Sequence, residues 1–365
     1  MTATPRTTKP SPDQARLKEL MRRLAEATSS DALILSIYVD IRPEAHGERP
    51  ADRPELNAVR HRLNAIQATL KAHTPARESL DADIDRIDTY LEELDLAGSD
   101  GLAVFACGQI GLWEELRSNE PFRTQVAAGS TADLFQLARL LDDSVSAVVA
   151  VVDTNTCRLF VIRRGSLLEF AGPDEPPDEH RRHDQGGWSQ ARYQRHIDTQ
   201  DKRFAKEAAS AIETLAEQEK AQHLILAGDE RVIPILEGEL SEPARALVEH
   251  VIHVPMRAST EQVQAEVLPI LAAIEEAEAR ELADTAVAEW LAGDLGVVGI
   301  AATMSALEIG QVDQLVIDET AGIAEALRTE LTRKAALTDA RVEIVRDHPG
   351  LAQHEGVAAT LRYRI

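Results

Sequence analysis

The sequence has little cysteine: only Cys107 and Cys157 occur in 365 residues. They lie far apart in apolar, strand-like segments, and two thiols alone are too few to form a zinc site. Structural disulfides are rare in reducing compartments. We therefore expect both cysteines to be buried core thiols.

Long apolar runs are also missing. No window approaches 18 consecutive apolar residues, so no transmembrane helix and no membrane partner are expected. The first dozen residues, MTATPRTTKPSP, lack the apolar stretch of a signal peptide. These features predict a soluble cytoplasmic protein. Its composition, 44% hydrophobic and 28% charged, is ordinary for a globular chain, and its length allows two or three domains.

Positive charge is scarce, because 39 lysines and arginines stand against 62 acidic residues, giving a net charge of -23. This balance argues against nonspecific coating of DNA or of anionic membranes, so any nucleic-acid contact should be local. The exception is the stretch HRRHDQGGWSQARYQRH at residues 180–196. Between residues 180 and 206, seven basic residues stand against three acidic ones.

Strand-like and helix-like patterns alternate along the chain, which is typical of α/β folds. We predict three small α/β domains with mixed sheets. The expected order is a flexible N-terminal arm over residues 1–24, an N-terminal α/β domain over 25–143, a central domain over 144–257 and a C-terminal α/β domain over 258–365.

Several segments carry clear local patterns. DALILSIYVDIRP predicts a strand in which Leu33, Leu35, Ile37 and Val39 alternate, and SVSAVVAVVDTNTCRLFVIRR predicts a buried hairpin. GDLGVVG has neither a preceding strand nor a following lysine, so it predicts a turn between helices and not a phosphate loop.

The double glycine at Gly186 and Gly187 can press its backbone amides against a phosphate, a carbonyl or an RNA groove. The alternative is a plain flexible turn before a helix. Trp188 follows, then Ser189, and a tryptophan in such a loop either folds back onto its domain or is presented for stacking on a base. The neighbouring arginines favour stacking.

From Ser189 to about Lys220 the chain predicts one long helix, with apolar residues such as Phe204, Ala208 and Ile212 on its buried face. A second side carries basic residues, which either form a solvated face or bind phosphates. The candidate RNA-binding residues are Arg181, Arg182, His183, Arg192, Arg195, His196 and Arg203.

Other chemistry is poorly supported by the same region. His180, His183 and Asp184 have metal-ligand spacing, but a third strong ligand is absent nearby and the arginines would repel a cation. Ser189 lacks the glycine-flanked elbow of a nucleophilic serine. No metal and no cofactor are expected.

Three stretches, taken together and in order, resemble the archaeal and eukaryotic class-I peptide-chain release factor and Pelota superfamily, specifically its bacterial branch. SAVVAVVDTNTCRLFVIRRGSLLEF is similar to the opening hairpin of the family's central domain. DQGGWSQARYQRH lies where release factors carry a Gly-Gly-Gln loop followed by a long helix. GIAATMSALEIGQVDQLVIDE and the closing GVAATLRYRI are similar to the C-terminal domain. The resemblance covers residues 144–365, with a looser match at SIYVDIRP.

The resemblance implies a release-factor/Pelota-like architecture and a factor that binds the ribosome. The central domain would reach toward ribosomal RNA at the peptidyl-transferase centre, and the N-terminal domain would lie toward the decoding site. The C-terminal domain would contact the stalk base or a translational GTPase such as elongation factor Tu. Transfer RNA is a further expected partner.

The departures from the family pattern decide which activity to expect. Trp188 stands where release factors carry glutamine, and Gln190 lies two residues later. A misplacement of about 1 Å can cost roughly a hundredfold in rate, so Gln190 is too far displaced for equivalent positioning of water. The stop-codon signature Asn-Ile-Lys-Ser is absent from the N-terminal domain.

These differences favour a noncatalytic occupant of the ribosomal A site, with a rescue or hibernation role, similar to Pelota and Balon-type proteins. The enzymatic alternative is peptidyl-tRNA hydrolysis or tRNA cleavage with Gln190 as the catalytic residue, as in Vms-like relatives whose loop glutamine is shifted. A third alternative is a protein-binding adaptor that keeps the fold without binding RNA.

Overall fold

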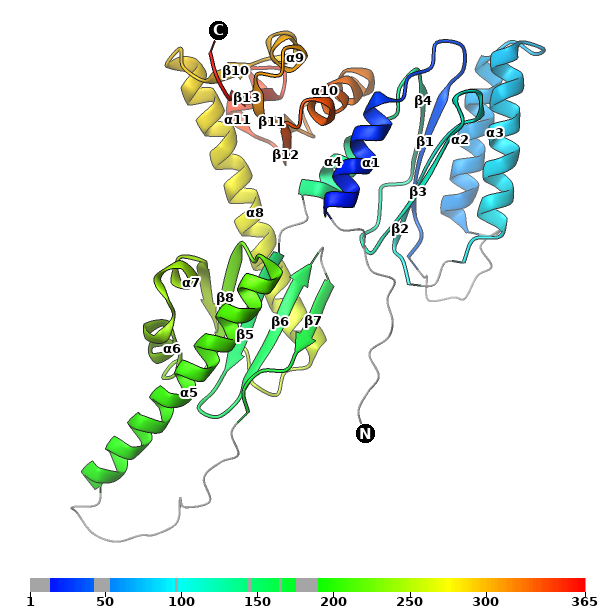
Figure 1. The fold of residues 1–365 in the computed structure, drawn as a ribbon. Coiled ribbons are helices and arrows are strands. Elements are labelled where there is room, and N and C mark those ends of the chain that lie inside the picture. Colours follow the sequence, from blue (N-terminus) through cyan, green and yellow to red (C-terminus); the bar gives the residue numbers. More distant parts are fainter. Residues whose placement is uncertain are drawn as a thin grey trace. The chain divides into compact units, whose positions relative to one another are not determined.

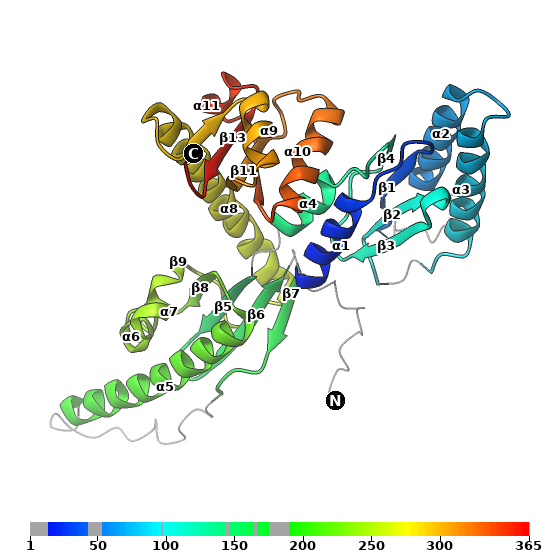
Figure 2. The same ribbon diagram turned by 45° about the horizontal axis from the view of Figure 1, so that its top comes forward.

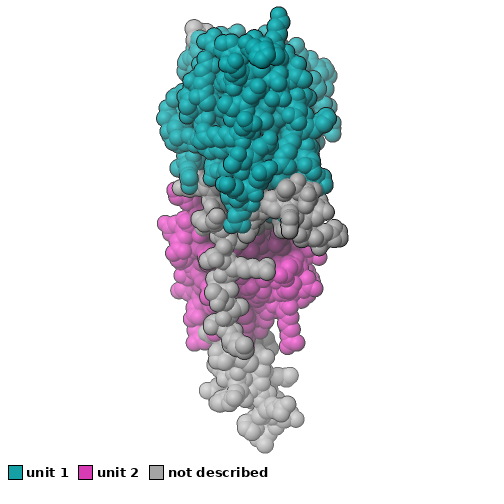
Figure 3. Space-filling view, turned by 90° about the vertical axis from the view of Figure 1, so that its right-hand side faces the viewer, with its two compact units in different colours: residues 1–143, 276–365 teal, residues 144–275 magenta. Residues whose placement is uncertain are grey.

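The computed structural model describes residues 14–42, 53–95, 98–142, 146–163, 166–174 and 190–364, with only the backbone described at 163, 166 and 190–200. These residues form three sheets with helices against them, which confirms the predicted α/β class; two of the sheets are mixed, as predicted, and the third is antiparallel (Figure 1). The chain divides into two compact units. Unit 1 comprises residues 1–143 and 276–365, and unit 2 comprises residues 144–275 (Figure 3). The bounds of the three expected domains stay a prediction.

The N-terminal sheet of unit 1 is fully antiparallel and has the strand order β3-β2-β1-β4. Its strands are β1 (Ile34–Asp40), β2 (Gly101–Cys107), β3 (Leu112–Ser118) and β4 (Gln125–Gly129). The helices α2 (Pro54–Thr69) and α3 (Pro75–Glu92) cover one face, and α1 (Gln14–Glu26) and α4 (Phe135–Asp142) cover the other. A sheet covered on both faces requires strands that are apolar on both sides.

Strand β1 meets that requirement. Leu35, Ile37 and Val39 face the helices α2 and α3, as the alternation predicts. Ile34 and Tyr38 are equally buried on the opposite face, against α1 and α4, so the strand has no exposed face. Tyr38 keeps its hydroxyl satisfied there by donating a hydrogen bond to the Asp133 carbonyl at 2.6 Å.

Helix α1 corrects the expected N-terminal arm, which is wrong for residues 14–24. Leu17, Leu20 and Leu24 recur at helical spacing and are buried in the core beneath β1 and β2. This helix is amphipathic, and it is stable because its apolar side packs on the face of the sheet, a partner that the local sequence does not reveal.

The C-terminal sheet of unit 1 has the order β10-β13-β11-β12, in which only β11 and β12 are parallel. Its strands are β10 (Gly296–Val298), β11 (Val312–Asp318), β12 (Arg341–Val345) and β13 (Val357–Leu361). Helices α9 (Ile300–Glu308) and α10 (Glu325–Leu337) cover one face. The short α11 (Pro349–Ala352) and the end of α8 (Thr260–Leu291) cover the other.

In this part of the chain, the stretch GIAATMSALEIGQVDQLVIDE contains α9 and β11, and GVAATLRYRI contains the strand β13. The prediction of a simple turn at GDLGVVG is wrong, because the segment contains β10. Val297 pairs with Ala359 of β13, which follows more than sixty residues later. A strand that depends on so distant a partner leaves little local signal.

Glu319 links the two sheets of unit 1. The Glu319 side chain is only 5% exposed. Its Oε1 accepts a hydrogen bond from Arg346 Nε, and Arg123 Nη2 lies 3.1 Å from the same oxygen. Arg139 Nη1 lies 4.0 Å away. Burial raises the pKa of Glu319, but the three guanidinium groups lower it more, and the net pKa is below the usual value.

Glu319→Gln should lower the free energy of unfolding of unit 1 by about 1 to 3 kcal/mol at pH 7, because a neutral amide leaves the arginines without their shared anion. The depressed pKa means that the carboxylate contributes its stability above pH of about 4.3, and that this is lost as pH falls through the folded pKa. Thermal unfolding at pH 7 and in acid measures the difference.

The matched control is Glu308→Gln, since Glu308 is 59% exposed and pairs with Lys334 on the surface. We expect it to cost less than about 1 kcal/mol. The role given to Glu319 would be contradicted if both variants unfolded alike, or if the gap between wild type and Glu319→Gln persisted unchanged in acid.

Unit 2 contains a five-stranded mixed sheet with the order β7-β6-β5-β8-β9. Its strands are β5 (Ser146–Val152), β6 (Cys157–Arg163), β7 (Ser166–Phe170), β8 (His223–Gly228) and β9 (Val248–Ile252). The predicted hairpin β5-β6 is confirmed, and β5, β8 and β9 run parallel. The helices α5 (Gln190–Glu219), α6 (Ile233–Glu239) and α7 (Glu242–Ala246) contribute to the core on one face, and the first half of α8 covers the other.

The expected state of both cysteines is confirmed. Cys107 and Cys157 are buried free thiols in different cores. Burial raises the pKa of the Cys157 thiol to about 12, so it remains protonated at neutral pH. No described helix is long and apolar enough to cross a membrane.

Candidate nucleic-acid interface

Helix α5 carries the described part of the candidate interface, and its sequence explains its length. Alanine, glutamate, glutamine, arginine and lysine dominate Gln190–Glu219, and all have high helix propensity. Thirty residues give a helix of about 45 Å, while a strand of seven residues spans about 23 Å. The helix therefore extends well beyond the sheet of unit 2, as both ribbon views show (Figures 1 and 2).

The C-terminal part of α5 anchors it. Phe204, Ala208, Ile212 and Leu215 are buried against the sheet, which confirms the predicted buried face over this part of the helix. Phe204 is the first large apolar side chain of the helix in this core and is 1% exposed. The anchored part thus begins about halfway along the helix.

The structure brings only some predicted site residues into view. Gly186, Gly187, Trp188, Ser189, Arg181, Arg182 and His183 lie outside the described residues. Gln190 is the first residue of α5, and Arg192, Arg195 and His196 follow in its first turns, where only the backbone is described. Arg203 is exposed. The roles given to these residues stay predictions.

The described stretch after Gln200 continues the basic side of the helix. Lys202, Arg203 and Lys206 are exposed, while Phe204 and Ala205 between them are buried. Positions 192, 195, 199, 203 and 206 are three or four residues apart, so they fall along one side of an α-helix. This spacing can align several cations with the regularly spaced phosphates of a nucleic acid.

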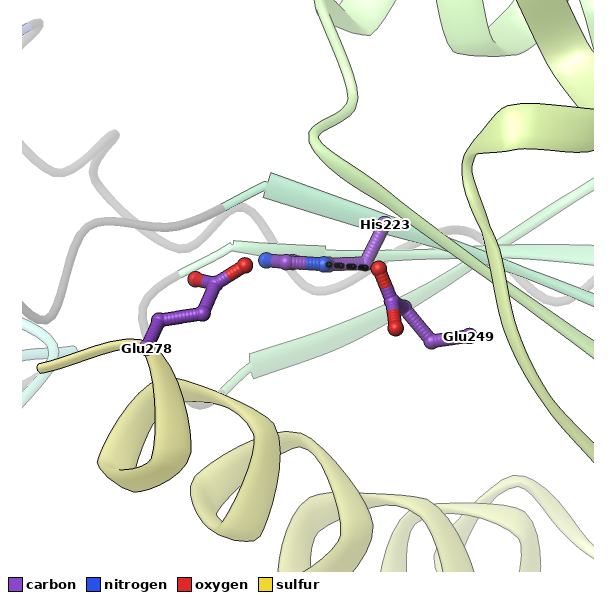
Figure 4. Close-up of side chains that lie close together, drawn as sticks. All are labelled: His223, Glu249 and Glu278. Atoms are coloured by element: carbon purple, nitrogen blue, oxygen red, sulfur yellow. Dashed lines mark ion pairs between the residues drawn. The ribbon is translucent and has the colours of Figure 1, made fainter. Parts of the chain in front are cut away.

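A histidine and a carboxylate lie near each other at the sheet of unit 2. His223 Nδ1, at the start of β8, lies 3.6 Å from Glu249 Oε1 on β9 (Figure 4). The two side chains form an ion pair when the imidazole is protonated. Figure 4 also draws Glu278, which extends from α8 and belongs to unit 1. Within unit 2 the pair offers two ligands, fewer than the three or four of a zinc site, so we assign no metal to it.

Comparison with known proteins gives one family. Residues 133–272 match the model described as Bacterial archaeo-eukaryotic release factor family 10. The matched range begins just before α4, includes the whole sheet of unit 2 with α5, and ends inside α8. Over residues 133–272, less than half of the chain, this match confirms the resemblance to archaeo-eukaryotic release factors that the motifs indicate.

Solved structures with a similar chain share little sequence with it. The archaeal translation termination factor aRF1 is 18% identical, with 98% of this chain and 100% of that chain covered and a TM-score of 0.30. Ribosome-bound archaeal Pelota, solved with ABCE1, is 13% identical, with 97% of this chain and 95% of that chain covered and a TM-score of 0.45. The S. cerevisiae termination-like factor Dom34 is 12% identical, with 73% of this chain and 80% of that chain covered and a TM-score of 0.44. No curated protein sequence matches the chain.

Proposed function

Because residues 133–272 match the bacterial archaeo-eukaryotic release factor family 10, we propose that the chain is a translation factor that occupies the ribosomal A site in a rescue or hibernation role. One observation carries the proposal. The matched range spans the double glycine and the whole of α5, the part of an acidic chain in which basic residues gather.

Helix α5 supports this function by its length and its anchoring. Its second half is held in the core of unit 2, while its first half extends away from the sheet. A loop joined to the free end of such a helix can enter a narrow RNA cavity that the domain itself cannot enter. Basic residues along the helix would then neutralise phosphates and displace counterions, which makes binding sensitive to salt.

Trp188 favours binding over hydrolysis. An indole has an N–H donor but no acceptor, so it cannot orient a water molecule as a glutamine carbonyl can. Stacking of the ring on a base contributes about 1 to 3 kcal/mol. The enzymatic alternative gives Gln190 the active role, and its place as the first residue of α5 sets it next to the loop.

Cosedimentation with vacant 70S ribosomes over a salt series tests the proposal. We expect the wild type to bind at low salt and to dissociate as salt rises. Arg192→Glu should lower the affinity about tenfold or more and reduce the salt slope by about one, because a phosphate contact is lost. Trp188→Ala should weaken binding by roughly fivefold to a hundredfold, the equivalent of about 1 to 3 kcal/mol.

Arg341→Glu is the matched control for charge reversal, since Arg341 is 60% exposed and lies on β12 in unit 1, outside the family-matched range that contains α5. It should bind like the wild type. Peptidyl-tRNA hydrolysis measured on 70S ribosomes that carry peptidyl-tRNA separates the alternatives: hydrolysis that Gln190→Ala abolishes would make the protein an enzyme. A wild type that fails to cosediment at low salt would refute ribosome binding and favour the protein-binding adaptor.

A further inference from the structure

A cavity of about 580 Å³ lies in unit 1, remote in sequence from the glycine loop. It is formed where the end of β1, the first turns of α2, the segment before β4 and helix α4 come together. Four arginines from these four segments line it: Arg42, Arg62, Arg123 and Arg139. Its acidic lining residues are Asp40 and Glu55, so basic side chains outnumber acidic ones in a strongly acidic protein.

Arg62 is the most informative of the four. It is exposed on α2, and its Nη1 donates to the Thr124 carbonyl at 2.6 Å. Within the described part of the chain it has no carboxylate partner. A guanidinium has five N–H donors, so this single bond fixes the group and leaves several donors for a ligand.

Each of the other three arginines contacts a carboxylate. Arg42 forms a bidentate ion pair with the Asp40 carboxylate through Nε and Nη2, and the Arg42 side chain remains 60% exposed. Arg123 and Arg139 share the buried Glu319, which lies outside the cavity lining.

The volume of the cavity is large enough for an anion of moderate size. Pockets for small ligands typically have volumes of about 300 to 1,000 Å³. The first turn of α2 contributes Pro54 and Glu55 to the lining, and the N-terminus of a helix attracts negative charge. Phe122, which is 6% exposed, provides an apolar wall.

We propose that this cavity binds a phosphate group, with Arg62 as the principal ligand and Arg42 beside it. Planar guanidinium forks match the geometry of phosphate oxygens and bind them by paired, charge-assisted hydrogen bonds. The phosphate belongs either to a free phosphorylated molecule or to the backbone of an RNA. The site is independent of ribosome binding through α5.

Two probes distinguish these sources. The first is pyrophosphate, measured by isothermal titration calorimetry at low ionic strength, and the second is a fluorescent single-stranded RNA oligonucleotide, measured by anisotropy. Arg62→Gln should weaken binding by about tenfold to a hundredfold, as expected for loss of charge-assisted bonds. Arg42→Gln should weaken it in the same direction.

Arg117→Gln is the matched control. Arg117 lies on β3, outside the cavity, and its Nη1 donates to the Asp95 carbonyl at 2.6 Å, the same type of contact that Arg62 makes. It should bind both probes like the wild type, and circular dichroism verifies that all variants are folded.

Each result decides the proposal. Pyrophosphate binding that requires Arg62 identifies a free phosphorylated ligand. RNA binding that requires Arg62, without pyrophosphate binding, identifies a phosphodiester backbone. The proposal is refuted if the wild type binds neither probe at low salt, or if Arg62→Gln and Arg117→Gln bind equally. None of these results depends on ribosomes, so failure here leaves the A-site proposal intact.

Discussion

Replacing Gly228 with alanine is expected to lower the free energy of unfolding of unit 2 by about 2 to 4 kcal/mol. Gly228 ends β8 with φ of +134°, a conformation that side chains rarely adopt. An added Cβ would lie 1.9 Å from the Val152 carbonyl oxygen on the neighbouring β5. Because the obstacle is backbone where the parallel strands β5 and β8 end, the ends of these two strands must separate to make room.

Gly238→Ala provides the control within the same unit. Gly238 lies in α6, and an added Cβ there has no heavy atom within 4 Å. Alanine should stabilise the helix by up to about 1 kcal/mol, because glycine is the weaker helix former. Amide hydrogen exchange of β5 and β8 measures both effects locally. Equal protection in the two variants would contradict the close approach at Gly228.

Phe204→Ala should destabilise unit 2 by about 3 to 5 kcal/mol. The ring is 1% exposed and lies in the core formed by α5, α6 and the sheet. Its removal leaves a cavity at the point where α5 first meets the sheet. We therefore also expect faster hydrogen exchange in α5 around residues 204–216, measured by mass spectrometry.

Phe204→Leu is the matched control, since it keeps most of the apolar volume and should cost less than Phe204→Ala. The anchoring role would be wrong if Phe204→Ala unfolded like the wild type. It would also be wrong if exchange increased throughout unit 2 while the helix stayed protected.

Local patterns in the sequence predicted much of the fold. The β-branched runs of β5 and β6 and the helical spacing along α5 carry their signal within a few turns of chain. Helix α1 and strand β10 were missed because their stability comes from distant partners. Leu17 needs the core beneath β1, and Val297 needs Ala359.

The same distinction applies to the sites. Gly186, Trp188 and Arg192 cluster within a few residues, so composition alone singled out their segment, although their roles remain predictions. The arginines of the unit 1 cavity are spread from Arg42 to Arg139. No motif joins them, because only the packing of α2 and α4 on the sheet brings them together.

Unit 1 is built from two stretches of chain, with the whole of unit 2 between them. A ribosome synthesises the chain at about 5 to 20 residues per second, from the N-terminus, and domains fold as units. Unit 2 can thus fold while the rest of unit 1 has not yet been made. Glu319 meets Arg123, 196 positions earlier, only after the whole of unit 2 has been synthesised. Nascent chains that stop before residue 319 would therefore lack this carboxylate, and the core of unit 1 can be completed only after unit 2 has been made.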